Sequence, residues 1–226
     1  MLYELPKPRY VSMSDTAGSR GRDERVGEVE QRAKRELRRR VVAARRAVPV
    51  AVREAEAAAL AAAALPLDRP GTVCAYWPVD VEPGSPALLD GLVRRGCRVL
   101  LPLVTQQGPL DWAEYTGTSA LRAGPLGLLE PAGPALGAAA IATAVLVLVP
   151  ALAVDWRGIR LGRGGGHYDR TLPLARPGTL LVAIVRDEEV LASVPAQPHD
   201  FPVTAALTPR RGLFPLPTKP CGPALA

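Results

Sequence analysis

The chain has 226 residues, enough for one large domain that buries a hydrophobic core without disulfides or a structural metal. Hydrophobic residues make up 48% and charged residues 22%, a balance that excludes disorder for the body of the chain. Three cysteines and two histidines are too few for a disulfide framework or a histidine-rich metal centre. The composition indicates a cytoplasmic α/β-type protein.

The net charge of +6 is concentrated near the N-terminus. Residues 20–53 carry 12 Lys or Arg and 5 Asp or Glu, whereas residues 54–226 sum to −1. A basic helix that binds nucleic acid is one interpretation of this segment. Because the body has no basic patch and no aromatic residues interleave the basic ones, we expect no nucleic-acid partner.

We expect three regions: a disordered N-terminal tail over residues 1–30, an α/β domain over 31–213, and a Pro-rich C-terminal tail over 214–226. Met13 is a second plausible start within the first region. The uncharged stretch Pro131–Val154 is interrupted by prolines and glycines, which favours loops and a buried strand over a membrane span. We therefore expect no membrane partner, and a monomer.

The first predicted elements are helices. Apolar residues at spacings of three and four predict an amphipathic helix over 28–48. An Ala-rich second helix follows over Val50–Leu65, between two prolines. Ser85 followed by proline is typical of a helix start and predicts a helix over Ala87–Arg95.

Short apolar runs predict the strands of a sheet. They occupy Val73–Trp77, Cys97–Val104, Pro109–Tyr115, Ala144–Val149 and Thr179–Val185. Gly117–Gly137, with irregular glycines and prolines, is predicted to be loop. This order of elements predicts an α/β fold with a mostly parallel central sheet flanked by helices, three-layered and Rossmann-like, with N-terminal helices.

The segment Gly158–Arg170 follows a predicted buried strand and precedes a short predicted helix, which is where α/β folds bind ligands. Its glycines allow backbone N–H groups to approach an anion, and Arg160 and Arg163 suit phosphate oxygens. The pattern is neither the Walker loop nor the dinucleotide fingerprint. A glycine-rich turn beside a core strand is the alternative. Asp169 could hold Mg²⁺ or act only as a partner of the helix dipole.

Lys34 and Arg38 lie four residues apart on one face of the first helix, and Arg45 falls on the same side. Like charges at this spacing repel, so an anion between them would offset that cost. The alternative is a solvated basic face.

Trp77 and Glu82 follow the first predicted strand. An aromatic ring and a carboxylate at one sheet edge could stack on a heterocycle and bond its amino groups. The alternative is that both residues only shape the turn from strand to helix.

Together these segments resemble the 5-formyltetrahydrofolate cyclo-ligase family, also called 5,10-methenyltetrahydrofolate synthetases. The resemblance rests on Ala33–Arg38, Tyr76–Pro78 with Glu82, Gly127–Pro131 and, most specifically, Gly158–Arg170. It covers about residues 33 to 210. It implies an ATP- and Mg²⁺-dependent ligase that converts 5-formyltetrahydrofolate to 5,10-methenyltetrahydrofolate with release of ADP and phosphate. A related ATP-using enzyme with a non-folate substrate is the alternative.

The resemblance also implies roles for single residues. ATP would contact Lys34, Arg38, Arg160, Leu161, Gly162, Arg163, Gly164, Gly165, Gly166, His167 and Tyr168. The folate would contact Trp77, Glu82, Arg163, Gly164, Gly165, Gly166 and His167. Arg160 and Arg163 would be catalytic, and Asp169 would bind the metal.

Three positions depart from the family pattern. His167 stands where a tyrosine is frequent, and Ala151 replaces the usual glycine after Pro150. Thr204 stands where the family places a second metal-associated carboxylate. We expect Asp200 or water to substitute for that carboxylate.

Overall fold

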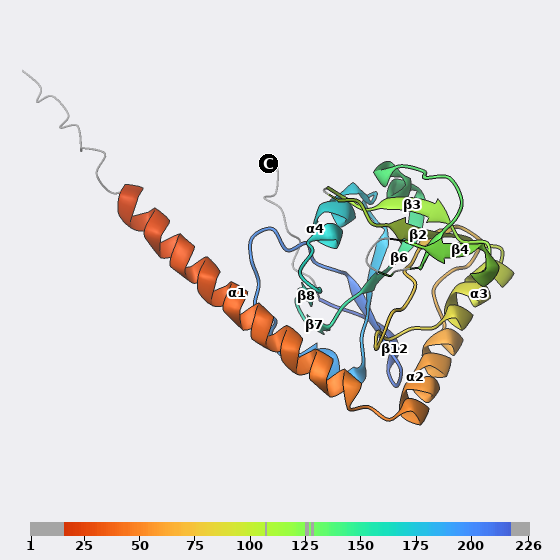
Figure 1. Ribbon diagram of the computed structural model, residues 1–226, viewed down its shortest axis with the longest axis horizontal. Helices are drawn as coiled ribbons and strands as arrows, with labels where there is room; N and C mark the ends of the chain where they lie inside the picture. The colour runs from red at the N-terminus through yellow and green to blue at the C-terminus, as the bar shows by residue number, and fades with distance from the viewer. Residues whose placement is uncertain (1–15, 107, 125–126, 128, 218–226) are drawn as a thin grey trace, which may run out of the picture.

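The computed structural model describes residues 16–106, 108–124, 127 and 129–217 (Figure 1). Residues 1–15 of the expected N-terminal tail and 218–226 of the expected C-terminal tail lie outside these ranges. Within the ranges, no helix combines the length and apolar character needed to cross a membrane.

A seven-stranded sheet forms the centre of the molecule. In spatial order its strands are β12 (Gly212–Pro215), β11 (Ala205–Thr208), β9 (Leu180–Ile184), β6 (Ala144–Pro150), β1 (Thr72–Cys74), β2 (Arg98–Leu103) and β3 (Asp111–Glu114). The five inner strands run parallel, and the two edge strands are antiparallel to their neighbours. The predicted mostly parallel sheet is thereby confirmed.

Both faces of this sheet are buried, as the continuous apolar strands predicted. On β6, Leu146 and Leu148 face a core that includes side chains of α2 (Val50–Ala62) and α3 (Pro86–Arg94). Val147 and Val149 face the opposite core, which reaches the segment around α4 (His167–Thr171). Helices therefore flank the sheet on both sides (Figure 1).

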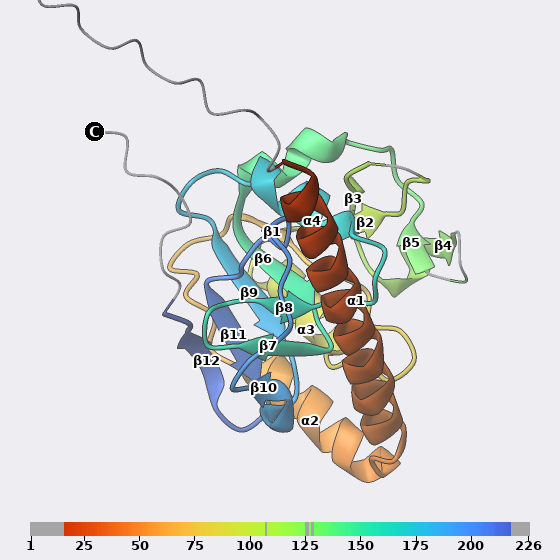
Figure 2. The same ribbon diagram turned by 90° about the vertical axis from the view of Figure 1, so that its left-hand side faces the viewer.

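The helix α1 (Thr16–Arg46) packs on a second, small sheet of β10 (Val190–Leu191), β7 (Ala153–Asp155) and β8 (Arg160–Leu161). Leu37 and Val41 contact a cluster that includes Leu152 and Leu161. Figure 2 shows α1 running across these strands, and Figure 1 shows its first turns extending beyond the body.

Several boundaries differ from those expected. α1 begins at Thr16, so residues 16–30 are helical rather than a disordered tail; they include three Arg and three Glu and contain no proline. The segment 117–137, expected to be loop, contains the hairpin β4 (Leu121–Ala123) and β5 (Leu129–Pro131). At the other end, β12 reaches Pro215. The strands of the small sheet, and β11 and β12 of the central sheet, were not predicted. Each has only two to four residues, and runs this short show no clear periodicity.

Arg45 anchors the end of α1 to the body. Its side chain is buried, and Nε and Nη2 lie 2.7 and 2.8 Å from the carboxylate oxygens of Glu189. Nη2 also donates to Ala151 O at 2.7 Å, at the end of β6. The expectation that Arg45 joins Lys34 and Arg38 around an anion is therefore wrong: a buried carboxylate already neutralises it.

We predict that Arg45→Met lowers the free energy of unfolding by about 3 kcal/mol, because it leaves Glu189 buried without its partner. Arg46→Met is the matched control. Arg46 is exposed and lies 3.6 Å from Asp80, so its loss should change stability by less than about 1 kcal/mol. Urea denaturation of both variants measures this, and equal destabilisation by the two would contradict the anchoring role.

Candidate active site

A cavity of about 450 Å³ opens at the carboxyl ends of the central parallel strands. Pro102 and Val104 from the end of β2, and Pro150 and Ala151 from the end of β6, form part of its wall. This is where ligands bind in open α/β sheets. The cavity brings together all the candidate site residues: Lys34, Arg38, Trp77, Glu82, Arg160, Leu161, Gly162, Arg163, Gly164, Gly165, Gly166, His167, Tyr168 and Asp169.

The glycine segment between β8 and α4 forms one wall of the cavity. Gly164 has φ +111° and Gly166 has φ +66°, left-handed conformations that side-chain-bearing residues rarely adopt. Among the described residues, none accepts a hydrogen bond from the backbone N–H groups of 163–166. Unpaired N–H groups in such a turn are suited to bind an anion.

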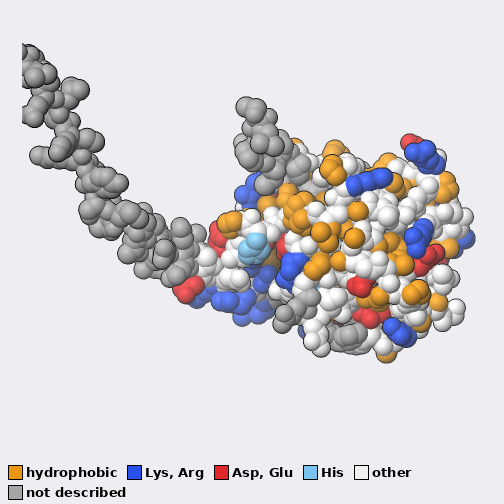
Figure 3. Space-filling view, turned by 90° about the horizontal axis from the view of Figure 1, so that it is seen from above, with side chains coloured by type: hydrophobic (Ala, Val, Ile, Leu, Met, Phe, Trp, Pro, Cys, Tyr) orange, Lys and Arg blue, Asp and Glu red, His pale blue; other side chains and the backbone are white. Residues whose placement is uncertain are grey.

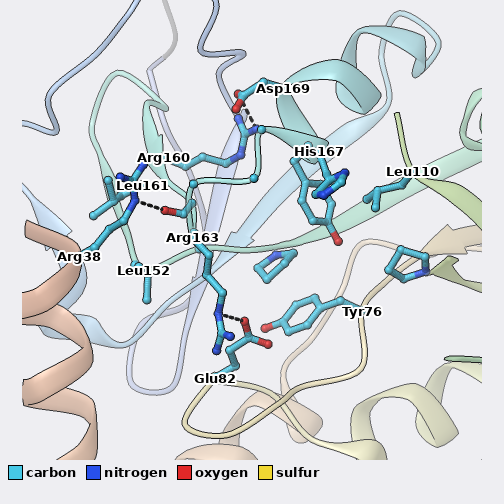
Figure 4. Close-up of a pocket in the computed structure, with 18 of the residues that line it drawn as sticks. Arg38, Tyr76, Glu82, Leu110, Leu152, Arg160, Leu161, Arg163, His167 and Asp169 are labelled. Carbon is cyan, nitrogen blue, oxygen red and sulfur yellow. Dashed lines mark hydrogen bonds and ion pairs between the residues drawn. The ribbon is translucent and has the colours of Figure 1, made fainter. Parts of the chain in front are cut away.

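Two cations contributed by α1 face this segment. Arg38 Nε donates to Gly162 O at 2.8 Å, so the helix and the glycine turn are joined directly (Figure 4). Burial lowers the pKa of Arg38, although Asp200 opposes the shift. Lys34 is buried and lies 2.6 Å from Asp200 Oδ2. Figure 3 shows Lys and Arg side chains gathered along α1 where it meets the body.

The two arginines of the glycine segment are held by carboxylates. Arg160 Nη2 lies 2.8 Å from Asp169 Oδ1, and its other branch donates to Phe201 O. Burial lowers the pKa of Arg160, and Asp169 opposes that shift. Arg163 is half-exposed, and its Nε lies 2.9 Å from Glu82 Oε1 (Figure 4). Both guanidinium groups are thus oriented before any ligand arrives.

Glu82 has a partner for each oxygen. Oε1 contacts Arg163, and Oε2 accepts a hydrogen bond from Val79 N at 3.1 Å. Burial raises the pKa of Glu82 above its usual value, while Arg163 and the Val79 N–H partly oppose this. Loss of Arg163 would therefore shift the pKa of Glu82 further upward.

Two aromatic residues near Glu82 shape the cavity. The Trp77 ring lines the cavity and packs against Tyr115, with 6.2 Å between the ring centroids and 45° between the ring planes. The Tyr168 hydroxyl is buried and has no hydrogen-bond partner in the described part of the chain. Burial raises the pKa of Tyr168 strongly, so the group remains a neutral donor. An unpaired buried hydroxyl in a cavity wall points to a ligand that supplies an acceptor.

Asp169 is the candidate metal ligand. Its Oδ1 accepts hydrogen bonds from Arg160 and Phe201 N, whereas Oδ2 has no hydrogen-bond partner among the described residues. No group of three or more His, Cys, Asp or Glu suited to hold a metal occurs in the described ranges. Mg²⁺ usually takes one or two protein carboxylates and completes its shell with phosphate oxygens and water. Asp169 fits that mode.

Thr204 lies outside this group. Its hydroxyl and its backbone N–H form hydrogen bonds with Leu181, a residue of β9, and it does not line the cavity. Asp200 does line the cavity, as do the other departures from the family pattern, His167 and Ala151.

Sequence reasoning gave no role to several residues that line the cavity, among them Gln197, Tyr76 and Glu130. Gln197 Oε1 accepts a hydrogen bond from Lys34 Nζ at 3.4 Å, across 163 positions of the sequence. No local pattern could have revealed that contact. Glu130 lies within Gly127–Pro131, a segment that matched the family without an assigned function.

Comparison with known proteins gives a consistent result. The model of the 5-formyltetrahydrofolate cyclo-ligase family matches residues 30–209. A Mycolicibacterium smegmatis protein named 5-formyltetrahydrofolate cyclo-ligase is 50% identical over 192 residues, covering 82% of this chain and 98% of the relative. An Escherichia coli K12 protein of the same name is 31% identical over 143 residues, covering 62% of this chain and 79% of the relative.

The fold is shared with solved structures. A 5,10-methenyltetrahydrofolate synthetase from Aquifex aeolicus superposes with a TM-score of 0.67 at 24% identity, covering 86% of this chain and 96% of that one. One from Mycoplasma pneumoniae gives a TM-score of 0.61 at 17% identity, covering 76% and 96%. At these identities the likeness to solved structures shows the fold alone. The match to the family model and the relative that is 50% identical show the family. The chain belongs to the 5-formyltetrahydrofolate cyclo-ligase family of ligases.

Proposed function

We propose that the protein converts 5-formyltetrahydrofolate to 5,10-methenyltetrahydrofolate with ATP and Mg²⁺, releasing ADP and phosphate. The observation that carries this is the composition of the single cavity described above. Backbone N–H groups that have no acceptor in the described part of the chain, together with four cationic side chains, adjoin aromatic and carboxylate groups in this cavity. One part suits a triphosphate, and the other suits a flat nitrogen heterocycle.

ATP would lie along the glycine segment. Backbone N–H groups of 163–166 would bind phosphate oxygens, with Lys34, Arg38 and Arg160 providing positive charge. The contact of Arg38 with Gly162 O supports this, because it places a guanidinium beside the turn. Leu161, His167 and Tyr168 would complete the nucleotide site. Asp169 would hold Mg²⁺, which supplies neutralisation of phosphate charge.

The folate would lie between Trp77 and Glu82 on one side and the glycine segment on the other. Trp77 offers a ring face for stacking, and Glu82 accepts hydrogen bonds from ring N–H groups. Arg163 contacts Glu82 directly, so it joins the two halves of the cavity. This contact supports a catalytic position for Arg163 between the nucleotide and the folate.

The reaction then needs orientation and charge neutralisation rather than a protein nucleophile. The formyl oxygen attacks the γ-phosphorus, and ADP leaves. N10 next attacks the activated formyl carbon and loses its proton, and phosphate leaves as the ring closes. Arg160 and Arg163 would stabilise the negative charge on the transferred phosphoryl group.

The direct test is the absorbance of 5,10-methenyltetrahydrofolate when purified protein meets 5-formyltetrahydrofolate. We expect an increase that requires both ATP and Mg²⁺. Protein that binds ATP but gives no product would contradict the folate assignment and favour the alternative, a related enzyme with a non-folate substrate. The cytoplasmic location and the monomeric state stay predictions.

We predict that Arg163→Ala lowers kcat by at least about a hundredfold, because a charge aimed at the transferred phosphoryl group is lost. Arg176→Ala, an exposed arginine outside the cavity, is the control and should keep kcat within about twofold. Steady-state turnover measures both. Near-normal kcat in Arg163→Ala would remove Arg163 from the reaction.

We also predict a shift in pH dependence. The Glu82 carboxylate is protonated as pH falls through its raised pKa, so folate affinity should weaken at acid pH. Arg163→Gln removes the cation that lowers this pKa, and the weakening should then begin at higher pH. Equilibrium folate binding across pH 4 to 8 measures it. Glu82→Gln should abolish the weakening of folate affinity at acid pH. If the same weakening persists in Glu82→Gln, it belongs to the titration of another group.

A further inference from the structure

Glu130 is a carboxylate of the cavity wall with no part in the reaction described above. It lies on β5, is 6% exposed, and accepts one hydrogen bond, from Val104 N to Oε1 at 2.9 Å. In the described ranges no cation pairs with it, and no hydrogen bond reaches Oε2. A carboxylate so deeply buried is costly unless further donors satisfy it.

Glu82, another carboxylate that lines the cavity, differs from Glu130 in its hydrogen bonding. Both of its oxygens already have partners, Arg163 and Val79 N. Glu130 therefore retains more accepting capacity than Glu82, although both line the same cavity.

The orientation of Glu130 is fixed by the backbone around it. The Val104 N–H holds Oε1 in place. Oε2 lies against Gly124, where a Cβ atom would come within 2.5 Å of it. The glycine therefore leaves room for the carboxylate in this position, and Glu130 lines the cavity from there.

The surroundings of Glu130 indicate which kind of ligand group it contacts. Pro102, Leu110 and Leu129 give this part of the wall an apolar character. In Figure 4, Leu110 lies at the opposite side of the close-up from Arg38, away from the cations of the nucleotide side. A phosphate would be repelled by the carboxylate, whereas a flat heterocycle with N–H donors would satisfy it.

We propose that Glu130 Oε2 accepts a hydrogen bond from an amino or ring N–H group of the pterin, so that two carboxylates hold the folate. This rests on the proposed folate substrate. Glu130 then determines affinity for the folate and has no contact with ATP.

Glu130→Gln tests this sharply. The glutamine oxygen still accepts from Val104 N, which fixes the amide and turns its NH₂ group to the position of Oε2. A donor then faces the donor of the ligand. We expect KM for 5-formyltetrahydrofolate to rise about tenfold or more, with KM for ATP and the melting temperature unchanged.

Glu114→Gln is the matched control. Glu114 lies on the neighbouring β3, is exposed, pairs with Arg98 at 2.8 Å and does not line the cavity. The same chemical change there should leave both KM values within twofold. If Glu130→Gln is unstable, Glu130→Asp, which withdraws the carboxylate by one methylene, should show the same selective loss.

The role is overturned if the folded Glu130 variant keeps its folate KM within twofold, or if KM for ATP rises as much as KM for the folate. Wild-type protein that makes no methenyl product would instead refute the proposed function, and the pterin contact with it. The two failures are distinguished because the first appears in the KM values of the variant and the second in the absence of product from the wild-type protein.

Discussion

Four cations face one cavity, and each is already paired: Lys34 with Asp200, Arg38 with Gly162 O, Arg160 with Asp169 and Arg163 with Glu82. Clustered positive charge would otherwise be costly, above all at the buried Lys34 and Arg160, so these pairings make the site compatible with a stable fold. They also fix the direction of each donor. A site whose charges are oriented beforehand loses little free energy when a polyanion binds.

This arrangement depends on a helix that does not cover the central sheet. α1 carries Lys34 and Arg38 but packs on the small sheet next to the end of β6. Arg45 sets its position by bonding both Glu189 and Ala151 O, and Ala151 is itself part of the cavity wall. The stability of this packing and the geometry of the cavity are therefore linked through one buried ion pair.

The sequence predicted the parts of this structure that have strong local signals. Long apolar runs such as Ala144–Val149 indicated the parallel sheet, and the glycines with Arg160 and Arg163 indicated the anion-binding turn. Contacts between distant segments had no such signal: Lys34 pairs with Asp200 across 166 positions, and Arg45 with Glu189 across 144. The basic face of the helix therefore suggested that Arg45 belongs to an anion site. In the structure Arg45 instead forms a buried ion pair with Glu189.

The central claim is that phosphates lie along the glycine segment while the pterin lies against Trp77 and Glu82. A crystal structure with a non-hydrolysable ATP analogue and 5-formyltetrahydrofolate tests it most directly. The account predicts phosphate oxygens within hydrogen-bond distance of the backbone N–H groups of 163–166, and the pterin stacked beside Trp77. Phosphates bound away from that turn, or a folate outside the cavity, would contradict it.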